Sequence, residues 1–217
     1  MNKSKFYNDW YERLWHDQDL DVYKWNRDNF QQLLKRNEIK EEFKNVLELG
    51  GGDGTHLKLY KLLFPKAIFY NCDISHQAID NGIAGIRHFQ FNVENEVFML
   101  GFFDLIIISD LVEHLKNPEL FLERVCSKAR YFLIKIPIEK VLWNKINEKL
   151  GRKPKIGKKH PSGHLHEYNL NEALGLVVKY FNVIDYSKQN YCTPKIAYEL
   201  CPLIFGTSLF VLAKRIE

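Results

Sequence analysis

The sequence predicts an α/β fold built on a mainly parallel sheet, and three observations lead to it. From Asn45 onward, short runs typical of strands alternate with helical patterns, as in proteins with parallel sheets. The run Phe103–Ser109 (FDLIIIS) is almost entirely apolar, which is typical of a central strand that helices cover on both faces. The run Asn45–Leu49 leads into a glycine-rich turn, Gly50–Gly54, at the end of a strand where open α/β sheets bind ligands. The 217 residues fit a single domain.

Seven runs have the character of strands. They are Asn45–Leu49, Ala67–Cys72, Arg87–Asn92, Phe103–Ser109, Arg130–Ile136, Val183–Ser187 and Ser208–Lys214. A long connection, and no helix, separates the last two runs. This connection would allow them to form an antiparallel pair at one edge of the sheet.

Two helices have clear start signals. Asn117 is followed by a proline and an acid, which suit the cap, the first helical position and the first turn of a helix. Asn169 is followed three residues later by Glu172, the pattern of a capping box ahead of a helix over Ala173–Phe181. Both helices are therefore expected to pack against the sheet.

Residues 1–44 are expected to form a helical extension ahead of the sheet. An apolar stripe with helical spacing predicts one helix there, and its members are Tyr7, Trp10, Tyr11, Leu14 and Trp15. A second stripe predicts the next helix, and its members are Tyr23, Asn26, Phe30, Leu33 and Leu34. Core packing is the expected role of most of these side chains.

Composition and charge exclude several classes of protein. Apolar residues make up 46% and charged residues 27%, as in ordinary globular domains. The N-terminal residues lack the apolar core of a signal peptide, and the longest apolar stretch, 200–213, is too short for a membrane helix. The net charge of +4 is mild, and the four cysteines form no CxxC pair. We therefore expect a cytoplasmic protein that binds neither membranes nor nucleic acid.

Two carboxylates beside the glycine turn indicate which ligand it binds. Asp73 ends the second strand, where an acid can accept hydrogen bonds from both hydroxyls of a ribose. A dinucleotide site would prefer G-x-G-x-x-G, which sets a pyrophosphate against a helix. Here the order is Gly50-x-Gly52-x-Gly54, and Glu48 precedes it. Because acids repel a pyrophosphate but suit an amino group and a sulfonium, the pattern favours a cationic cofactor that contains adenosine.

Four segments, in this order and spacing, make the chain resemble class I S-adenosylmethionine-dependent methyltransferases, within them the broad small-molecule group. They are LELGGGDGTH, NCDIS, FNVEN and FDLIIISDLVEHLKNPE. The resemblance is good over Asn45–Ile136 and loose elsewhere. It implies a Rossmann-like sheet of seven strands, mostly parallel with an antiparallel last strand and helices on both faces. It also implies S-adenosylmethionine as cofactor, S-adenosylhomocysteine as product, and one domain over 1–217, with a cofactor core at 45–136 and an acceptor side at 137–217.

The resemblance assigns cofactor contacts by position. The glycine turn would approach the methionine part, and Glu48 would hold either the turn or the amino group. Asp73 would bind the ribose, and Ile74 would pack on the adenine. Asn92 and Val93 would contact the polar edge of the adenine, although the family more often has Asp at the first of these positions. The full expected set is Glu48, Gly50, Gly51, Gly52, Gly54, Asp73, Ile74, Asn92, Val93, Ser109 and Asp110, of which the last two would lie under the reacting sulfur.

The acceptor side is expected after the fifth strand, where histidines cluster. His164 and His166 lie in the run His160–Tyr168, and similar His-x-x-x-Tyr stretches precede the next helix in many sugar and quinone methyltransferases. Histidine is the commonest base near neutral pH. His114 follows Asp110 by four residues, so a helical turn would bring both to the same cleft. The candidates for base or acceptor contact are therefore His114, His164 and His166, with packing or internal hydrogen bonding as the alternative role.

The acceptor is expected to be a small and anionic metabolite. Six basic residues and no acid lie between 149 and 159, which favours a phosphorylated amine, a sugar or a nucleotide-linked sugar, unless the run is a solvated loop. Two N-terminal tyrosines could reach a polar ligand with their hydroxyls while their rings stay buried. The expected acceptor contacts are Tyr7, Tyr11, Lys158, His164 and Tyr168.

Three alternatives were weighed against this interpretation. His160, His164, His166 and Glu167 could chelate an ion, but no remote second ligand set accompanies them, so no metal site is expected. An NAD-dependent oxidoreductase could share the sheet, although Glu48 would then lie beside its pyrophosphate. A noncatalytic partner subunit of the same fold would have no need for the ribose acid or the glycines.

Overall fold

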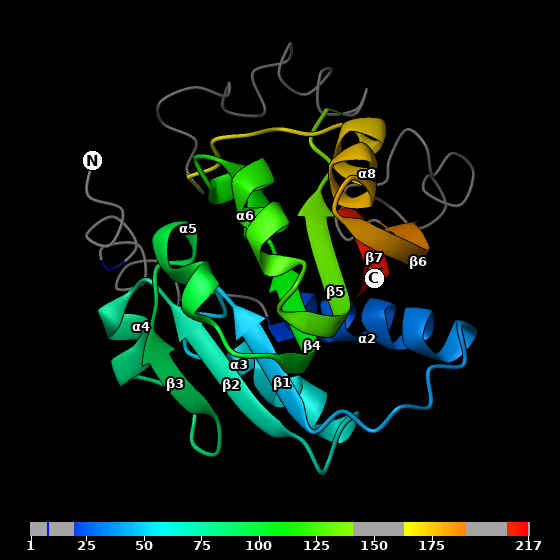
Figure 1. Cartoon of the computed structure of the whole chain (residues 1–217). Coiled ribbons are helices and arrows are strands. Elements are labelled where there is room, and N and C mark those ends of the chain that lie inside the picture. The colour runs from blue at the N-terminus through cyan, green and yellow to red at the C-terminus, as the bar shows by residue number, and fades with distance from the viewer. Residues whose placement is uncertain (1–7, 9–19, 141–162, 190–207, 217) are drawn as a thin grey trace.

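A computed structural model describes Asn8 and residues 20–140, 163–189 and 208–216, and these residues form one twisted sheet with helices around it (Figure 1). The strand order is β3-β2-β1-β4-β5-β7-β6. The strands are β1 Asn45–Leu49, β2 Ile68–Asp73, β3 Arg87–Gln90, β4 Phe103–Ser109, β5 Ala129–Pro137, β6 Phe181–Gln189 and β7 Ser208–Arg215. The pairs from β3 to β5 are parallel, whereas β7 runs antiparallel to both β5 and β6. The predicted sheet with its antiparallel last strand is therefore confirmed.

The helices in this part of the chain are short except for the first and last. They are α2 Leu20–Arg36, α3 Thr55–Lys58, α4 His76–Asp80, α5 Val93–Glu96, α6 Pro118–Val125 and α8 Leu170–Val178, with 3₁₀ turns η2 Leu59–Leu62, η3 Val97–Met99 and η4 Val112–His114. No helix in these ranges is both long enough and apolar enough to span a bilayer.

Helices cover both faces of the sheet because successive strand residues point to opposite sides. On β4, Leu105 and Ile107 pack with α2, α3 and η2, whereas Ile106 and Ile108 pack with α5, α6 and α8. The second apolar stripe of the sequence is confirmed as the buried face of α2, which contains Phe30 and Leu33. Two cores, one on each face, therefore hold the central strands rigidly.

Capping decides where the helices begin, and at Asn92 it corrects a predicted boundary. The Asn117 side chain accepts from the amide of Leu120, and Asn169 forms the expected capping box with Glu172. The helix expected to reach Phe181 ends at Val178, and Phe181 begins β6. The third strand, expected to end at Asn92, stops at Gln90, because the Asn92 side chain caps α5.

The carboxyl ends of β1, β2, β4 and β5 meet at one edge of the sheet. Leu49 at the end of β1 lies beside Cys72 on β2 and Ile108 on β4, and Ser109 lies beside Lys135 on β5. The residues that the sequence assigned to the cofactor lie at or after the ends of β1, β2 and β4, except that Asn92 and Val93 follow β3. The first aromatic stripe, Tyr7, Trp10, Tyr11, Leu14 and Trp15, lies outside the described residues.

Candidate cofactor and acceptor site

The glycine turn is a left-handed loop that connects β1 to α3. Gly50, Gly52 and Gly54 have φ angles of 71°, 57° and 83°, a region that residues with a Cβ rarely adopt. The amide of Gly50 donates to the carbonyl of Cys72 on β2 at 2.8 Å. The turn is thus tied to the neighbouring strand, and an added Cβ would lie 2.9 Å from Leu111 at Gly50 and 2.9 Å from His88 at Gly54.

Gly51 is needed for a different reason, since its missing Cβ faces the protein. An added Cβ would lie 2.2 Å from Asn71 Oδ1 and 2.7 Å from Glu48 Oε2. Asn71 is fully buried, and its amide nitrogen donates to the carbonyl of Gly52 at 2.7 Å. Gly51 therefore gives room to two buried polar side chains that support the turn from beneath.

Gly51→Ala is expected to lower the free energy of unfolding by about 1–3 kcal/mol, because buried atoms would have to move apart to admit the methyl group. Denaturant unfolding measures this change. The matched control is Gly101→Ala, where an added Cβ meets nothing within 4 Å. Equal stability of the two variants would contradict the packing role assigned to Gly51.

Asp73 fastens the glycine turn to the end of β2. Its Oδ2 accepts from the amide of Gly52 at 3.0 Å, and its Oδ1 accepts from the amide of Ser75 at 2.8 Å. Burial raises the pKa of this carboxyl, and the two amides oppose that rise. Each carboxylate oxygen has a further lone pair, so the group can still accept from two hydroxyls. Ser75 Oγ also donates to Asn8 Oδ1 at 2.8 Å, which places that N-terminal residue beside the Asp73 turn.

Glu48 lies beneath the turn and is paired with a histidine that sequence reasoning did not select. Its Oε1 is 2.5 Å from Nδ1 of His56 on α3, and both side chains are buried. Tyr60 Oη lies 3.3 Å from the other ring nitrogen of His56. Of the two roles offered for Glu48, this geometry favours support of the turn. The sequence feature that could have identified this pair is the short separation of Glu48 and His56, which flank the glycine turn.

The residues predicted to contact adenine have structural partners of their own. Ile74 is partly exposed after β2. The Asn92 side-chain oxygen Oδ1 accepts from the amide of Glu94 at 3.1 Å, and Val93 belongs to the core on the α5 face. Their contacts with a cofactor stay predictions.

The i+4 spacing predicted that Asp110 and His114 share one face of a helix, but the structure has no helix at Asp110. The residue has φ 51°, and a 3₁₀ turn, η4, follows it. Its carboxylate lies 2.6 Å from Nζ of the buried Lys135 on β5. Ser109 Oγ, just before it, is buried and has no hydrogen-bond partner within the described part of the chain.

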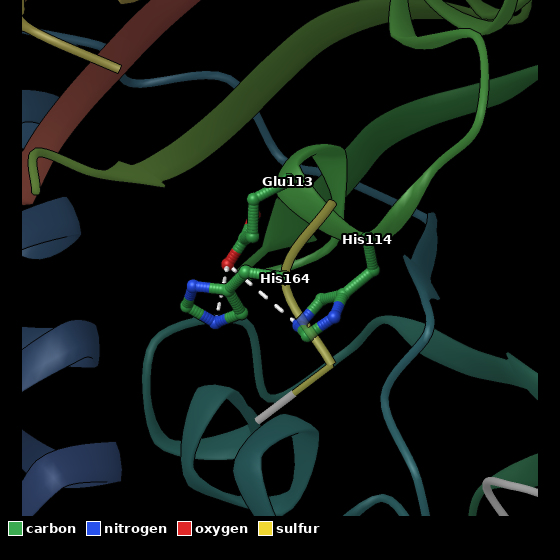
Figure 2. A group of neighbouring side chains, drawn as sticks. All are labelled: Glu113, His114 and His164. Atoms are coloured by element: carbon green, nitrogen blue, oxygen red, sulfur yellow. Dashed lines mark ion pairs between the residues drawn. The ribbon is translucent and has the colours of Figure 1, made fainter. Parts of the chain in front are cut away.

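The histidines meet at the same edge, around a buried carboxylate (Figure 2). The rings of His114 and His164 pack edge to face with centroids 4.7 Å apart, and Glu113 lies between them. Glu113 is 0% exposed, and burial, together with the nearby Asp110 carboxylate, raises its pKa well above the ordinary value. His164 Nδ1 lies 3.1 Å from Glu139 Oε2. His164 thus joins the end of β4, through Glu113, to the end of β5, through Glu139.

His166 and Tyr168 continue this wall of the site. Their rings stack with centroids 6.1 Å apart, and burial raises the pKa of Tyr168 to about 12. The Tyr168 carbonyl accepts from the amides of Glu139 and Lys140 at 3.0 and 3.1 Å. Three of the predicted acceptor-side residues, His164, His166 and Tyr168, therefore lie together. His114, also predicted, packs on His164, whereas Tyr7, Tyr11 and Lys158 are outside the described residues.

Comparison with known proteins supplies the family. Residues 14–174 match the model of a family described as a methyltransferase domain. The chain belongs to this methyltransferase family. The match covers most of the chain, and it confirms the predicted class and the expectation of S-adenosylmethionine as cofactor. It also argues against the NAD-dependent alternative. Among curated proteins, none matches the sequence.

Several solved structures share the fold at low sequence identity. A SAM-dependent methyltransferase from Archaeoglobus fulgidus is 19% identical, with a TM-score of 0.61 over 87% of this chain and 94% of the other. The PH0226 protein from Pyrococcus horikoshii OT3 is 14% identical, with a TM-score of 0.64 over 96% and 99%. The N-terminal domain of EvdMO1, crystallised with SAH bound, is 11% identical, with a TM-score of 0.55 over 88% and 81%.

Proposed function

We propose that this methyltransferase transfers the methyl group of S-adenosylmethionine to an oxygen or nitrogen atom of a small anionic metabolite. The observation that carries the proposal is the position of His164. Its ring is held by Glu139 and packs on His114, at the sheet edge that also carries the glycine turn. A cofactor on the turn and an acceptor against the histidines would then approach each other across the end of β4.

The residues of the turn fit the proposed cofactor. Asp73 offers an acceptor pair for the ribose hydroxyls, and Ser109 Oγ is a buried polar atom with no hydrogen bond to any residue that the structure describes. Glu48 and Asp73 give this end of the sheet a negative character, which suits a cation. When bound, the cofactor supplies an electrophilic methyl group on a sulfonium.

The chain's own part in such a reaction is alignment, exclusion of water and handling of one proton. Alignment of the two reactants can lower the barrier by roughly 7–11 kcal/mol. A hydroxyl acceptor must also lose its proton, whereas an amine needs only to arrive unprotonated. We assign acceptor contact to His114 and His164 and proton removal to His166, whose Nε2 has no hydrogen-bond partner among the described residues.

The anionic class of acceptor rests on the sequence. The basic residues between 149 and 159, Lys158 among them, follow β5 in the sequence and precede the histidine run, and the family resemblance assigns this stretch to the acceptor side. Guanidinium and ammonium groups bind phosphate through charge-assisted hydrogen bonds. Phosphorylated amines, sugars and nucleotide-linked sugars are therefore the acceptors to screen.

His164→Ala and His166→Ala are each expected to slow methyl transfer by about 100-fold or more while the affinity for S-adenosylhomocysteine stays unchanged. Transfer of a labelled methyl group to a panel of the three acceptor classes measures the rate. Calorimetric titration measures the affinity for S-adenosylhomocysteine. Glu42→Ala serves as a control, because Glu42 pairs with Lys66 in solvent before β1. Full activity of both histidine variants would show that the acceptor does not bind against these histidines. If the wild type bound the cofactor but methylated no acceptor, the result would support a noncatalytic subunit.

A further inference from the structure

Glu113, His114 and His164 form a group whose possible ligand atoms all lie within 4.8 Å of one another (Figure 2). Glu113 Oε1 lies 3.8 Å from Nε2 of His114 and 3.9 Å from Nε2 of His164. Glu113 and His114 come from η4, directly after β4, and His164 comes from the segment before α8. The three side chains therefore converge from two parts of the sequence about 50 residues apart.

The backbone holds the two parts together. The Glu113 carbonyl accepts from the amide of Leu165 at 2.8 Å and from the amide of His166 at 3.1 Å. These bonds fix the chain on the C-terminal side of His164 against η4. The convergence of the side chains thus follows from the main chain, which gives the group a defined geometry before any ligand arrives.

The Glu113 carboxyl group has two imidazoles near one oxygen but no hydrogen bond to another described residue. The side chain is fully buried, and neither Oε1 nor Oε2 makes a hydrogen bond to another residue in the described ranges. Burial of an ionised carboxylate without hydrogen bonds costs several kcal/mol, so such groups ordinarily stay neutral, pair closely with a cation or bind a metal. Protonated imidazoles in direct ion pairs would approach to about 2.7–2.9 Å, and both imidazoles stay well beyond that distance.

The surroundings of His164 are those of a metal ligand. Histidines that bind metals usually present their second ring nitrogen to a carboxylate, which fixes the tautomer and the orientation of the ring. Here Nδ1 of His164 faces Oε2 of Glu139 at 3.1 Å, so Nε2 is the nitrogen that faces Glu113. This arrangement leaves the Nε2 lone pair directed into the group.

We propose that Glu113, His114 and His164 bind a divalent transition-metal ion such as Zn²⁺, which holds an oxygen atom of the methyl acceptor. Two imidazoles and one carboxylate suit such ions and leave coordination positions open, whereas Mg²⁺ and Ca²⁺ prefer oxygen ligands. Bonds of about 2.0–2.1 Å place tetrahedral ligands about 3.3 Å apart, so Glu113 and each histidine need to converge by roughly half an ångström, and ligand atoms 4.8 Å apart by about 1.5 Å. The sequence predicted no metal site, because the ligand candidates within the run 160–167 lack a remote second set, which the structure supplies as Glu113 and His114.

The role toward the acceptor rests on the proposed function. A hydroxyl oxygen held by the ion loses its proton more readily, and we assign that proton to His166. The oxygen then forms a bond to the methyl carbon while the bond from that carbon to sulfur breaks. The electron pair of the broken bond stays on sulfur, which gives S-adenosylhomocysteine and the methyl ether.

Titration of the metal-free full chain with Co²⁺ tests the site, because Co²⁺ in a low-coordinate site absorbs visible light. We expect one equivalent of Co²⁺ to bind. Zn²⁺ should displace the bound Co²⁺, whereas Mg²⁺ should not. Glu139→Gln is expected to weaken Co²⁺ binding about 10-fold, and Glu113→Gln and His164→Ala more strongly. The metal is also expected to raise the thermal midpoint of the wild type but not of Glu113→Gln.

His76→Ala is the matched control, since His76 and Asp80 form an exposed pair with Nδ1 and Oδ2 2.6 Å apart. This variant should bind Co²⁺ as the wild type does. Equal Co²⁺ affinity in the wild type and Glu113→Gln, or displacement by Mg²⁺ as effective as by Zn²⁺, would overturn the proposal. Titration with S-adenosylhomocysteine reports the fold of each variant. If the ligand variants lose Co²⁺ binding but the wild type methylates none of the three acceptor classes, the metal site stands and the acceptor assignment is wrong. If the wild type still transfers the methyl group in the presence of a chelator, the metal has no role in the transfer.

Discussion

Asp73→Ala is expected to weaken the binding of S-adenosylhomocysteine by about 100-fold. The carboxylate is positioned to accept two hydrogen bonds from a ribose, and hydrogen bonds to charged groups contribute about 1.5–3 kcal/mol each. The expected factor corresponds to about 2.8 kcal/mol, which is close to the lower bound of about 3 kcal/mol for two such bonds. The variant also loses the bonds from the amides of Gly52 and Ser75, so part of the loss arises from a loosened turn. Calorimetric titration of wild type and variant measures the effect.

Two further variants separate the causes. Asp73→Asn keeps an acceptor oxygen for one of the two amides but loses the charge, so it should bind with intermediate affinity. Glu42→Ala removes a carboxylate at the opposite edge of the sheet, before β1, and should bind normally. If Asp73→Ala bound S-adenosylhomocysteine as tightly as the wild type, the ribose would have to lie elsewhere, and the cofactor assignment to this edge would be wrong.

Local signals made the sheet and its cofactor edge predictable. The strands Asn45–Leu49 and Phe103–Ser109 have the predicted boundaries, because each is a short apolar run with a sharp polar or glycine end. The caps at Asn117 and Asn169 also lie where expected, since a cap depends on residues three positions apart. A predicted boundary was wrong where a residue could serve in two elements, as at Asn92, which could end a strand or cap a helix.

The partners of the site residues could not be predicted, because they come from distant strands. Nothing in the local sequence pairs Asp110 with Lys135, or His164 with Glu139. The i+4 argument for Asp110 assumed an α-helical turn, but its left-handed backbone and the 3₁₀ turn that follows direct its carboxylate toward β5. Glu113 was overlooked because a charged residue next to a histidine is usually solvated. A search for acids and histidines at the ends of neighbouring strands could have found it.

The buried pair of Glu48 and His56 gives the largest expected change in stability. Their side chains are 2% and 5% exposed, and Oε1 and Nδ1 lie 2.5 Å apart. Removal of one member of a buried pair leaves the other without compensation, at a cost of about 3–5 kcal/mol. Glu48→Ala and His56→Ala are each expected to lower the thermal midpoint by roughly 6–20 °C, given about 2–4 °C per kcal/mol for a chain of this size.

The double variant decides whether this loss belongs to the pair. If the two side chains stabilise the glycine turn together, Glu48→Ala/His56→Ala will cost about 0.5–3 kcal/mol less than the sum of the single changes. The same cycle on the exposed pair of Glu42 and Lys66, with Oε1 and Nζ 2.8 Å apart, should show no measurable coupling, because water and salt screen it. Additive effects in the buried cycle would mean that each side chain acts through separate contacts, such as that of His56 with Tyr60. Coupling in the buried cycle together with weakened binding of S-adenosylhomocysteine would show that the pair holds the turn in the conformation that receives the cofactor.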